Sequence, residues 1–454
     1  MSLAAMFVER TRERSLALWG NLDPRALDRT AHPLRAIISR VPIKRVQAIS
    51  LNIVSARCYH GLALPLQHAT DLRTLYIASR KGACVQLPHF NMDLPTLEVV
   101  TLKCVGFSWE WLGRLSSLSS LTVDMTRGCR ADPSFYDVLG TLHSLPNLSN
   151  LELCMKMTHV PSHLELGPLE NPQYSFDNIR DFITLPQIRR FSLRSEPNSV
   201  HHLLAHLILP RDTELRIGSV GSFDTRWDSP ILSGILARHY AQQDADPAHP
   251  LPLRGLLMRD LAPGHLIICL AFDSLGLYTG SLVSLKNPDT HAHHPLILDI
   301  YSPDDPVSLA EVFEDLFATL SKDPAVRLSL NTVVIQAPVH RSRDRDFSKC
   351  LWMSYPRMSL ARILVFGPIV KAFAAEFNGD GLRLPFFEYL RIREFDFADH
   401  PAVLDNIMLG IGRRADTFVK THEASGDPNA LELQGCGFND DQLVRLSEVP
   451  NDLE

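Results

Sequence analysis

One six-residue pattern of apolar and other positions recurs along the chain. Residues 72–77, 97–102, 118–123 and 148–153 each carry apolar side chains at the first, fourth and sixth positions. Successive side chains of a β-strand point to opposite faces, so the alternation at the fourth and sixth positions is typical of a strand with one buried face. Each segment is therefore predicted to be a short strand whose apolar residues lie in the core.

The spacing of the copies indicates a structural repeat. The fourth-position residues Ile49, Leu75, Val100 and Leu121 are separated by 26, 25 and 21 residues. A strand signature of this kind that returns every 20–29 residues or so is typical of leucine-rich repeats. One repeat cannot bury its own apolar face, so successive repeats must stack. The sequence thus predicts an α/β leucine-rich-repeat solenoid, a horseshoe with a parallel concave sheet, outer helices and irregular repeats.

Later copies are spaced less evenly. The next fourth-position residues, Leu151 and Phe191, follow at intervals of 30 and 40 residues, which indicates insertions between the strands. Further copies lie at residues 188–193, 253–258, 330–335, 360–365, 387–392 and, less regularly, 431–436. The expected divisions are an N-terminal lead-in at 1–33, regular repeats at 34–223, irregular repeats with insertions at 224–346, and C-terminal repeats with a cap at 347–454.

A Leu-Pro dipeptide comes shortly before several copies. Proline disfavours helical geometry in the residue before it, so it is expected to end a preceding helix and make each unit run helix, turn, strand. Asp132 is expected to cap a helix that begins at Pro133, and Asp440 with Asp441 to cap a later one. The dipeptides begin at Leu94, Leu145, Leu185 and Leu384.

Composition restricts the class of protein. Of 454 residues, 45% are hydrophobic and 21% are charged, which is ordinary for a folded globular chain. The net charge of −6 argues against a nucleic-acid partner, because proteins of that class usually carry a basic surplus. The apolar run at 261–272 is shorter than the roughly 20 residues of a membrane helix, so no membrane contact is expected. We expect an intracellular protein, cytoplasmic or nuclear, whose eight scattered cysteines are reduced.

Candidate catalytic chemistry is sparse. His291, His293 and His294 form one possible metal-binding group, and His202 with His206 could form half of a zinc site, but no further ligand at suitable spacing completes either group. The chain has no G-x-S-x-G nucleophile elbow, no phosphate-binding loop and no dinucleotide fingerprint. We therefore expect that the protein is not an enzyme and has no cofactor.

The leading hypothesis is a non-catalytic scaffold that recognises another protein. The residues between the buried strand positions should point to the concave face of the solenoid, where a protein target would bind. The alternative is an enzyme, with or without a metal, that uses residues 224–346 as a catalytic insertion, because that stretch is rich in His and Asp. The candidate contact residues are Tyr76, Thr101, Lys103, Thr122, Asp124, Glu152, Arg190, Ser192, Arg194, Arg391 and Arg393.

Three features together resemble fungal F-box/leucine-rich-repeat proteins: Leu-Pro-x-Leu before strands, irregular unit lengths, and an Arg-rich opening at residues 9–19. In that family such an opening follows the F-box, and an alternating apolar strand leads into the repeats. The resemblance implies a substrate receptor of a cullin-type ubiquitin ligase, in which the F-box binds the adaptor of the ligase and the repeats hold the target. The helical F-box itself is not found ahead of the repeats. The implied partners are a protein target on the concave face and a cullin ubiquitin-ligase adaptor.

Overall fold

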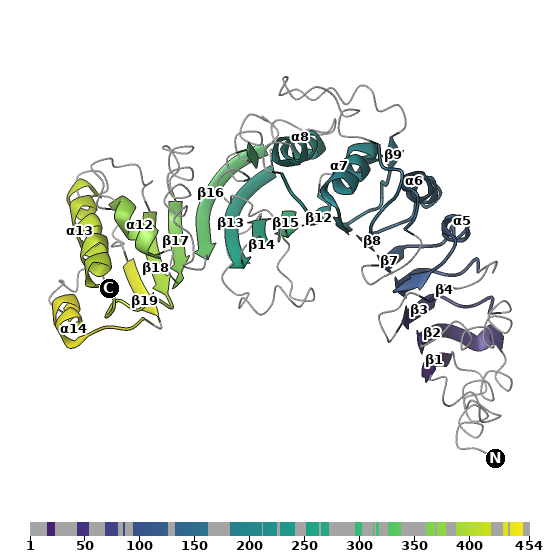
Figure 1. Cartoon of the computed structure of the whole chain (residues 1–454), viewed down its shortest axis with the longest axis horizontal. Helices are drawn as coiled ribbons and strands as arrows, with labels where there is room; N and C mark the ends of the chain where they lie inside the picture. Colours follow the sequence, from purple (N-terminus) through teal and green to yellow (C-terminus); the bar gives the residue numbers. More distant parts are fainter. Residues whose placement is uncertain are drawn as a thin grey trace, which may run out of the picture. The chain divides into compact units, whose positions relative to one another are not determined.

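A computed structural model of the chain gives its fold (Figure 1). The residues that it describes are 16–22, 43–53, 69–79, 85–86, 94–125, 132–161, 182–210, 212–224, 228–240, 251–262, 265–271, 296–301, 312, 315–316, 326–336, 360–367, 370–377, 387–418, 430–434 and 436–447. The chain divides into two compact units, Met1–Gly218 (unit 1) and Ser219–Glu454 (unit 2).

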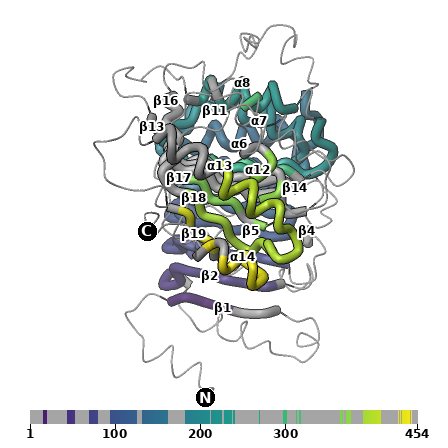
Figure 2. Tube along the Cα trace, turned by 90° about the vertical axis from the view of Figure 1, so that its left-hand side faces the viewer, coloured from purple at the N-terminus to yellow at the C-terminus, as the bar shows by residue number. Residues whose placement is uncertain are grey.

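Unit 1 is built on strands that lie side by side in chain order (Figure 1). The pairings from the first of these strands to β10 are parallel, and β1 and β2 lie next to each other in Figure 2. Parallel neighbours joined by connections that return to the same end of the sheet produce the predicted α/β organisation. The strands are β1 (Leu16–Leu22), β2 (Val46–Ile53), β3 (Thr74–Ser79), β5 (Val99–Lys103), β7 (Ser120–Asp124), β8 (Asn150–Cys154), β10 (Arg190–Ser195) and β12 (Glu214–Val220), of which β12 has its last two residues in unit 2.

The register of these strands follows the sequence pattern. Leu75 pairs with Val100, Val100 with Leu121, Leu121 with Leu151, and Leu151 with Phe191. Each of these side chains is at most 2% exposed. The prediction that the fourth-position residues lie on adjacent parallel strands and form one core row is confirmed.

Helices cover one side of the unit 1 sheet. Figure 1 shows α5 (Trp109–Gly113), α6 (Phe135–His143) and α7 (Pro197–His206) on the same side of the strands. Thr141 in α6 donates a buried hydrogen bond to the carbonyl of Trp109 at 2.9 Å, which ties α6 to α5. The remaining elements of unit 1 are short: η1 (Ile43–Arg45), β4 (Val85–Gln86) paired with β6 (Val105–Gly106), and β9 (Ile183–Thr184) paired with β11 (Leu207–Ile208).

The start of α6 differs from the sequence prediction. Ser134, not Asp132, occupies the N-cap, and Pro133 lies before the helix. The N–H of Phe135, the first helical residue, is bound by the carbonyl of Thr158 at 2.9 Å. A backbone acceptor from a later segment thus satisfies a donor that a capping side chain would otherwise have to bind.

The Leu-Pro dipeptides form the expected tight turns. In the three copies within unit 1, the N–H three residues after the leucine donates to the leucine carbonyl, from Leu97 to Leu94, Leu148 to Leu145 and Ile188 to Leu185. Proline suits the second position of such a turn because its φ is already fixed. The turn at Leu145 follows α6, whereas the turn at Leu185 follows the short strand β9, so the helix-turn-strand order holds for the former copy and is wrong for the latter.

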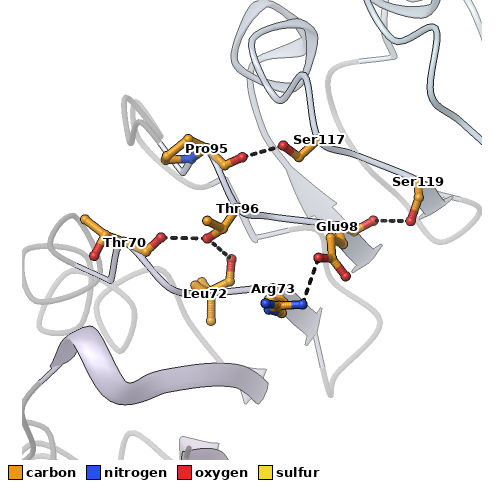
Figure 3. A network of polar contacts seen from close by, with 8 residues as sticks. All are labelled: Thr70, Leu72, Arg73, Pro95, Thr96, Glu98, Ser117 and Ser119. Carbon is orange, nitrogen blue, oxygen red and sulfur yellow. Dashed lines mark hydrogen bonds and ion pairs between the residues drawn. The ribbon is translucent and has the colours of Figure 1, made fainter.

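Hydrogen bonds fix the entrances to strands of unit 1, and Figure 3 shows those donated by the hydroxyls of Thr96, Ser117 and Ser119. The carbonyls of Arg73, Glu98, Ser119 and Ser149 each accept two backbone N–H groups from the next strand segment. Hydroxyls add to these bonds, since Thr96 donates to Leu72 O at 3.1 Å and Ser119 to Glu98 O at 3.1 Å. Polar backbone groups at the edge of the core therefore have partners, which locks the register that buries the apolar rows.

Unit 2 has a mixed sheet in the order β15-β14-β13-β16-β17-β18-β19. The neighbouring strands β13, β16, β17, β18 and β19 are parallel. In contrast, β14 is antiparallel to both β13 and β15. The prediction of a wholly parallel sheet is wrong at β14, which lies within the predicted irregular repeats at 224–346. The strands are β13 (Leu251–Ala262), β14 (His265–Ala271), β15 (Leu296–Tyr301), β16 (Val326–Gln336), β17 (Leu360–Phe366), β18 (Phe387–Arg393) and β19 (Ala430–Gln434).

The parallel strands of unit 2 also follow the repeat register. Leu256 pairs with Val333, Val333 with Ile363, Ile363 with Leu390, and Leu390 with Leu431. These are the fourth-position residues of the later copies, or the equivalent leucine of the last one, so the uneven spacing of the sequence does not disturb the pairing. The helices of unit 2 are α8 (Asp228–Tyr240), α12 (Val370–Phe377), α13 (Pro401–Phe418) and α14 (Asp440–Ser447), of which α12 and α13 pack together.

The cap of α14 is one residue earlier than predicted. Asp440 and Asp441 are the first residues of the helix, and Asn439 caps it. The N–H of Gln442 donates to Asn439 Oδ1 at 2.9 Å, and the N–H of Asn439 donates to Gln442 Oε1 at 3.0 Å. This reciprocal pair is a capping box, which leaves the two carboxylates in the first turn near the positive end of the helix dipole.

None of the helices within the described ranges is both long enough and apolar enough to cross a bilayer. The histidines His291, His293 and His294 lie outside the described residues.

Candidate protein-binding face

The side chains that alternate with the buried rows of unit 1 form a second surface, here called the open face. On β3, β5 and β7 its central row consists of Tyr76, Thr101 and Thr122, which pair in register. All three side chains are half-buried, between flanking residues that are fully buried. The row therefore offers an aromatic ring and hydroxyls at the surface of a rigid sheet, and such groups are suited to contact with a polypeptide.

The central row continues with charge on the later strands. Thr122 pairs with Glu152 on β8, and Glu152 pairs with Ser192 on β10. Glu152 is exposed and Ser192 is half-buried. The predicted contact residues from β3 to β10 thus lie in one line across adjacent strands.

A parallel row lies nearer the carboxyl ends of the strands. Lys103 pairs with Asp124, Asp124 with Cys154, and Cys154 with Arg194. Lys103, Asp124 and Cys154 are half-buried, while Arg194 is exposed. The structure therefore brings Lys103, Asp124 and Arg194 together with the central row, as predicted.

The row nearer the amino ends contains Arg190 and residues that the prediction omitted. Ser120 on β7 pairs with Asn150 on β8, and Asn150 pairs with Arg190. Arg190 Nε lies 3.4 Å from Glu214 Oε2 on β12, and the two side chains are 60% and 30% exposed. The third position of each repeat could have revealed this row. It flanks the buried fourth position, as the fifth position does, so both point to the open face.

A further omitted residue is Arg216 on β12. It is exposed between the buried residues Leu215 and Ile217, so it projects from the open face. The sequence from Thr213 to Ile217 follows the repeat only weakly, because it has five residues in place of six and begins with a threonine. The Thr213 hydroxyl is instead buried and donates to Ile188 O at 3.1 Å, which gives it a structural role in place of the missing leucine.

The open face is therefore divided by charge. The part on β3, β5 and β7 is mostly neutral, whereas β8, β10 and β12 present charged groups of both signs. At the ends of β8 and β10, Lys156 Nζ lies 2.6 Å from Glu196 Oε1, and this hydrogen bond raises the pKa of Lys156. The pair is largely exposed, so it contributes little stability.

The last two predicted contact residues lie in the other unit. Arg391 and Arg393 are on β18 and are half-buried. Arg391 pairs in register with Leu364 on β17, which is only 3% exposed although it alternates with the buried Ile363 and Val365. The expectation that intervening residues face solvent is wrong at Leu364, where both faces of the strand are covered. These two arginines are therefore not part of the open face of unit 1.

The two histidines of α7 considered as half of a zinc site pack around the ring of Phe135. His206 Nδ1 lies 2.7 Å from the carbonyl oxygen of His202, and both rings pack against Phe135 with centroid distances of 5.4 and 6.1 Å. His202 is 1% exposed. Within the described part of the chain, no group of three or more His, Cys, Asp or Glu side chains could hold a metal ion.

No protein-family model matches this chain, and a search of curated proteins finds no relative.

Proposed function

We propose that this protein is a non-catalytic recognition scaffold of the leucine-rich-repeat type, and that the open face of unit 1 binds a protein target. The observation that carries the proposal is the alignment of Tyr76, Thr101, Thr122 and Glu152 in register on adjacent parallel strands. Rigid strands hold these side chains in fixed relative positions, so a target that matches them pays little ordering cost on binding.

The proposal extends to the horseshoe architecture and to ubiquitination. Register-matched repeats in both units support a solenoid, in which each repeat packs on its neighbours. The resemblance of residues 9–19 supports a substrate receptor of a cullin-type ubiquitin ligase, with the ligase adaptor as a second partner. The alternative enzyme built on residues 224–346 has no described cluster in its favour and stays a prediction.

Photo-crosslinking tests the binding face. A benzophenone amino acid at Thr101 should capture a defined protein from native cell extract, whereas the same group at the exposed Tyr136 of α6 should not. Excess unmodified chain should compete for that protein and suppress its capture, whereas excess chain with Thr101→Arg and Thr122→Arg in the central row should not. Suppression by the double-threonine variant as strong as that by unmodified chain would overturn the proposal.

Co-purification tests the ligase role separately. Full-length chain that recovers the cullin adaptor together with the target is the expected result for a receptor. Recovery of the target without the adaptor would leave a plain scaffold and would refute the ligase role.

A further inference from the structure

Two arginines of the open face have no partner within the described part of the chain. Arg194 on β10 and Arg216 on β12 are both exposed, and neither guanidinium forms a hydrogen bond or an ion pair with a described residue. Arg190, two residues before Arg194 on the same face, is instead paired with Glu214. The two free cations are therefore available to an external anion.

The side chain of Arg194 is directed across β12 by a glycine. A Cβ atom at Gly218 would lie 2.9 Å from Arg194 Cγ and 3.2 Å from Arg194 Cβ. The arginine stem thus runs directly over the backbone of Gly218, which is buried beneath it. Arg216 projects from the same face two residues earlier on β12, at a distance of about 7 Å along the strand. The positive charges of both strands consequently gather over β12.

Two of the neighbouring carboxylates, those of Glu214 and Glu196, are held by other cations. Glu214 lies beside Arg190, and Glu196 lies 2.6 Å from Lys156. Glu152 is separated from β12 by Ser192 of the intervening strand. The local positive charge also stands out from a chain whose net charge is −6, so it does not reflect a generally basic surface.

We propose that Arg194 and Arg216 bind carboxylates of an acidic segment in the protein target, an inference that rests on the proposed function of the open face. The Arg190–Glu214 pair shows that an arginine of this face accepts a carboxylate partner. Asp124 and Glu152 lie on the same face and repel a doubly charged phosphate more than a singly charged carboxylate. Guanidinium groups can bind carboxylates through two parallel hydrogen bonds, which gives the contact directional specificity.

Fluorescence anisotropy with the full-length chain tests the proposal. The probe is a fluorescein-labelled peptide that alternates glutamate and serine, compared with peptides in which glutamine or phosphoserine replaces glutamate. We expect the glutamate peptide to bind most tightly. The double variant Arg194→Gln with Arg216→Gln should weaken its binding about tenfold.

Two variants control for general electrostatics and for position. Arg114→Gln removes an exposed arginine that follows α5, away from the open face, and should leave the affinity unchanged. Gly218→Ala keeps every charge but displaces the Arg194 stem, so it should weaken binding by a smaller factor. Charge reversal, Arg194→Glu with Arg216→Glu, should transfer binding to a peptide that alternates lysine and serine.

Three results would overturn the proposal: a double variant that binds the glutamate peptide as well as the unmodified chain does, an equal loss with Arg114→Gln, or a preference for the phosphoserine peptide. The proposed function has a separate test. If the target crosslinked at Thr101 is still captured by the double variant with unchanged affinity, the acidic-segment inference fails while the binding face stands. If chain with Thr101→Arg and Thr122→Arg competes for that target as well as unmodified chain does, the binding face itself fails.

Discussion

At Gly437 the chain passes so close to Asp396 that no side chain fits. A Cβ atom there would lie 2.8 Å from Asp396 Cγ and closer still to Oδ1. The approach is fixed by backbone hydrogen bonds, from Phe397 N–H to Gly437 O at 2.8 Å and from Gly437 N–H to Phe395 O at 3.1 Å. A single residue thus permits a contact between the end of β18 and the turn before α14.

Substitution at Gly437 should therefore be costly. We expect Gly437→Ala to destabilise unit 2 by about 1–3 kcal/mol, because Asp396 or the backbone must move. Gly140→Ala is the matched control, since a Cβ there meets nothing within 4 Å and alanine favours the interior of α6. The control should stabilise unit 1 by up to about 1 kcal/mol. Urea midpoints for both variants check the opposite signs, and equal effects would contradict the close approach.

A buried carboxyl at the start of α8 should make stability depend on pH. Burial raises the pKa of Asp228 from 3.8 to about 6, the charge of Asp224 adds to the rise, and a hydrogen bond from the Asp224 N–H opposes it. Between about pH 4 and 6 the folded state keeps a proton that the unfolded state has released, so this group lowers stability as pH rises through that window.

Asp228→Asn should remove that loss, because the amide oxygen can still accept the Asp224 N–H while no charge is buried. We expect the variant to gain up to about 3 kcal/mol over the unmodified protein at pH 7.5 and almost nothing at pH 4. Chemical denaturation at several pH values measures the difference. Asp224→Asn is the control, since that side chain is exposed and should change the pH profile much less. A constant difference between Asp228→Asn and the unmodified protein would refute the assignment.

Among the elements, α14 depends most clearly on a local motif. The helix spans Asp440–Ser447, a length that is marginal without added support. Its capping box is reinforced by Gln442, whose Nε2 donates to Phe397 O at 2.8 Å in a buried hydrogen bond. The capping box thus also anchors the helix to the segment after β18.

Loss of the cap should loosen the helix without unfolding the unit. We expect Asn439→Ala to cost about 0.5–2 kcal/mol and to speed amide exchange throughout α14. Asp440→Asn should have a smaller effect, because it removes only a favourable charge in the first turn. Hydrogen exchange followed by mass spectrometry compares the two variants, and equal protection would show that the box contributes little.

The strands were largely predictable at this scale, and the helix starts were not. Leu75, Val100 and Leu121 could be placed because burial of one strand face imposes alternation on the sequence, whichever connection follows. The cap at Ser134 could not, since the N–H of Phe135 is satisfied by Thr158, which is distant in sequence. The antiparallel β14 was missed because Leu266 to Leu270 are apolar without alternation, a pattern that does not specify direction.

At the scale of whole units, stability should be shared between neighbouring repeats. Leu121 is fully buried and pairs with Val100 on one side and Leu151 on the other. The central row of the open face of unit 1 could be predicted from the sequence as one line of residues. Arg216 could not be predicted, because the copy of the repeat that contains it lacks the first leucine. The paired strands of unit 1 thus hold the residues of the open face in place even where a copy of the repeat is incomplete.

A charged side chain in the core of one repeat should destabilise the neighbouring repeats as well. We expect Leu121→Asp to abolish the folding transition of unit 1, because an unpaired carboxylate cannot be buried and each repeat relies on its neighbours. Thr122→Asp, one residue later on the open face, should leave folding almost intact. Circular dichroism and exchange protection in β5 and β8 measure the spread. An unchanged melting curve for Leu121→Asp would refute its place in the core.

Forty residues separate Leu151 from Phe191 and 21 separate Val100 from Leu121, yet each pair sits side by side in the same register. Distance along the chain and distance in space are therefore uncoupled at the crossovers. Evolution could lengthen or shorten the connection between two strands, and so change what borders the binding site, while every residue inside the site kept its position in the sheet.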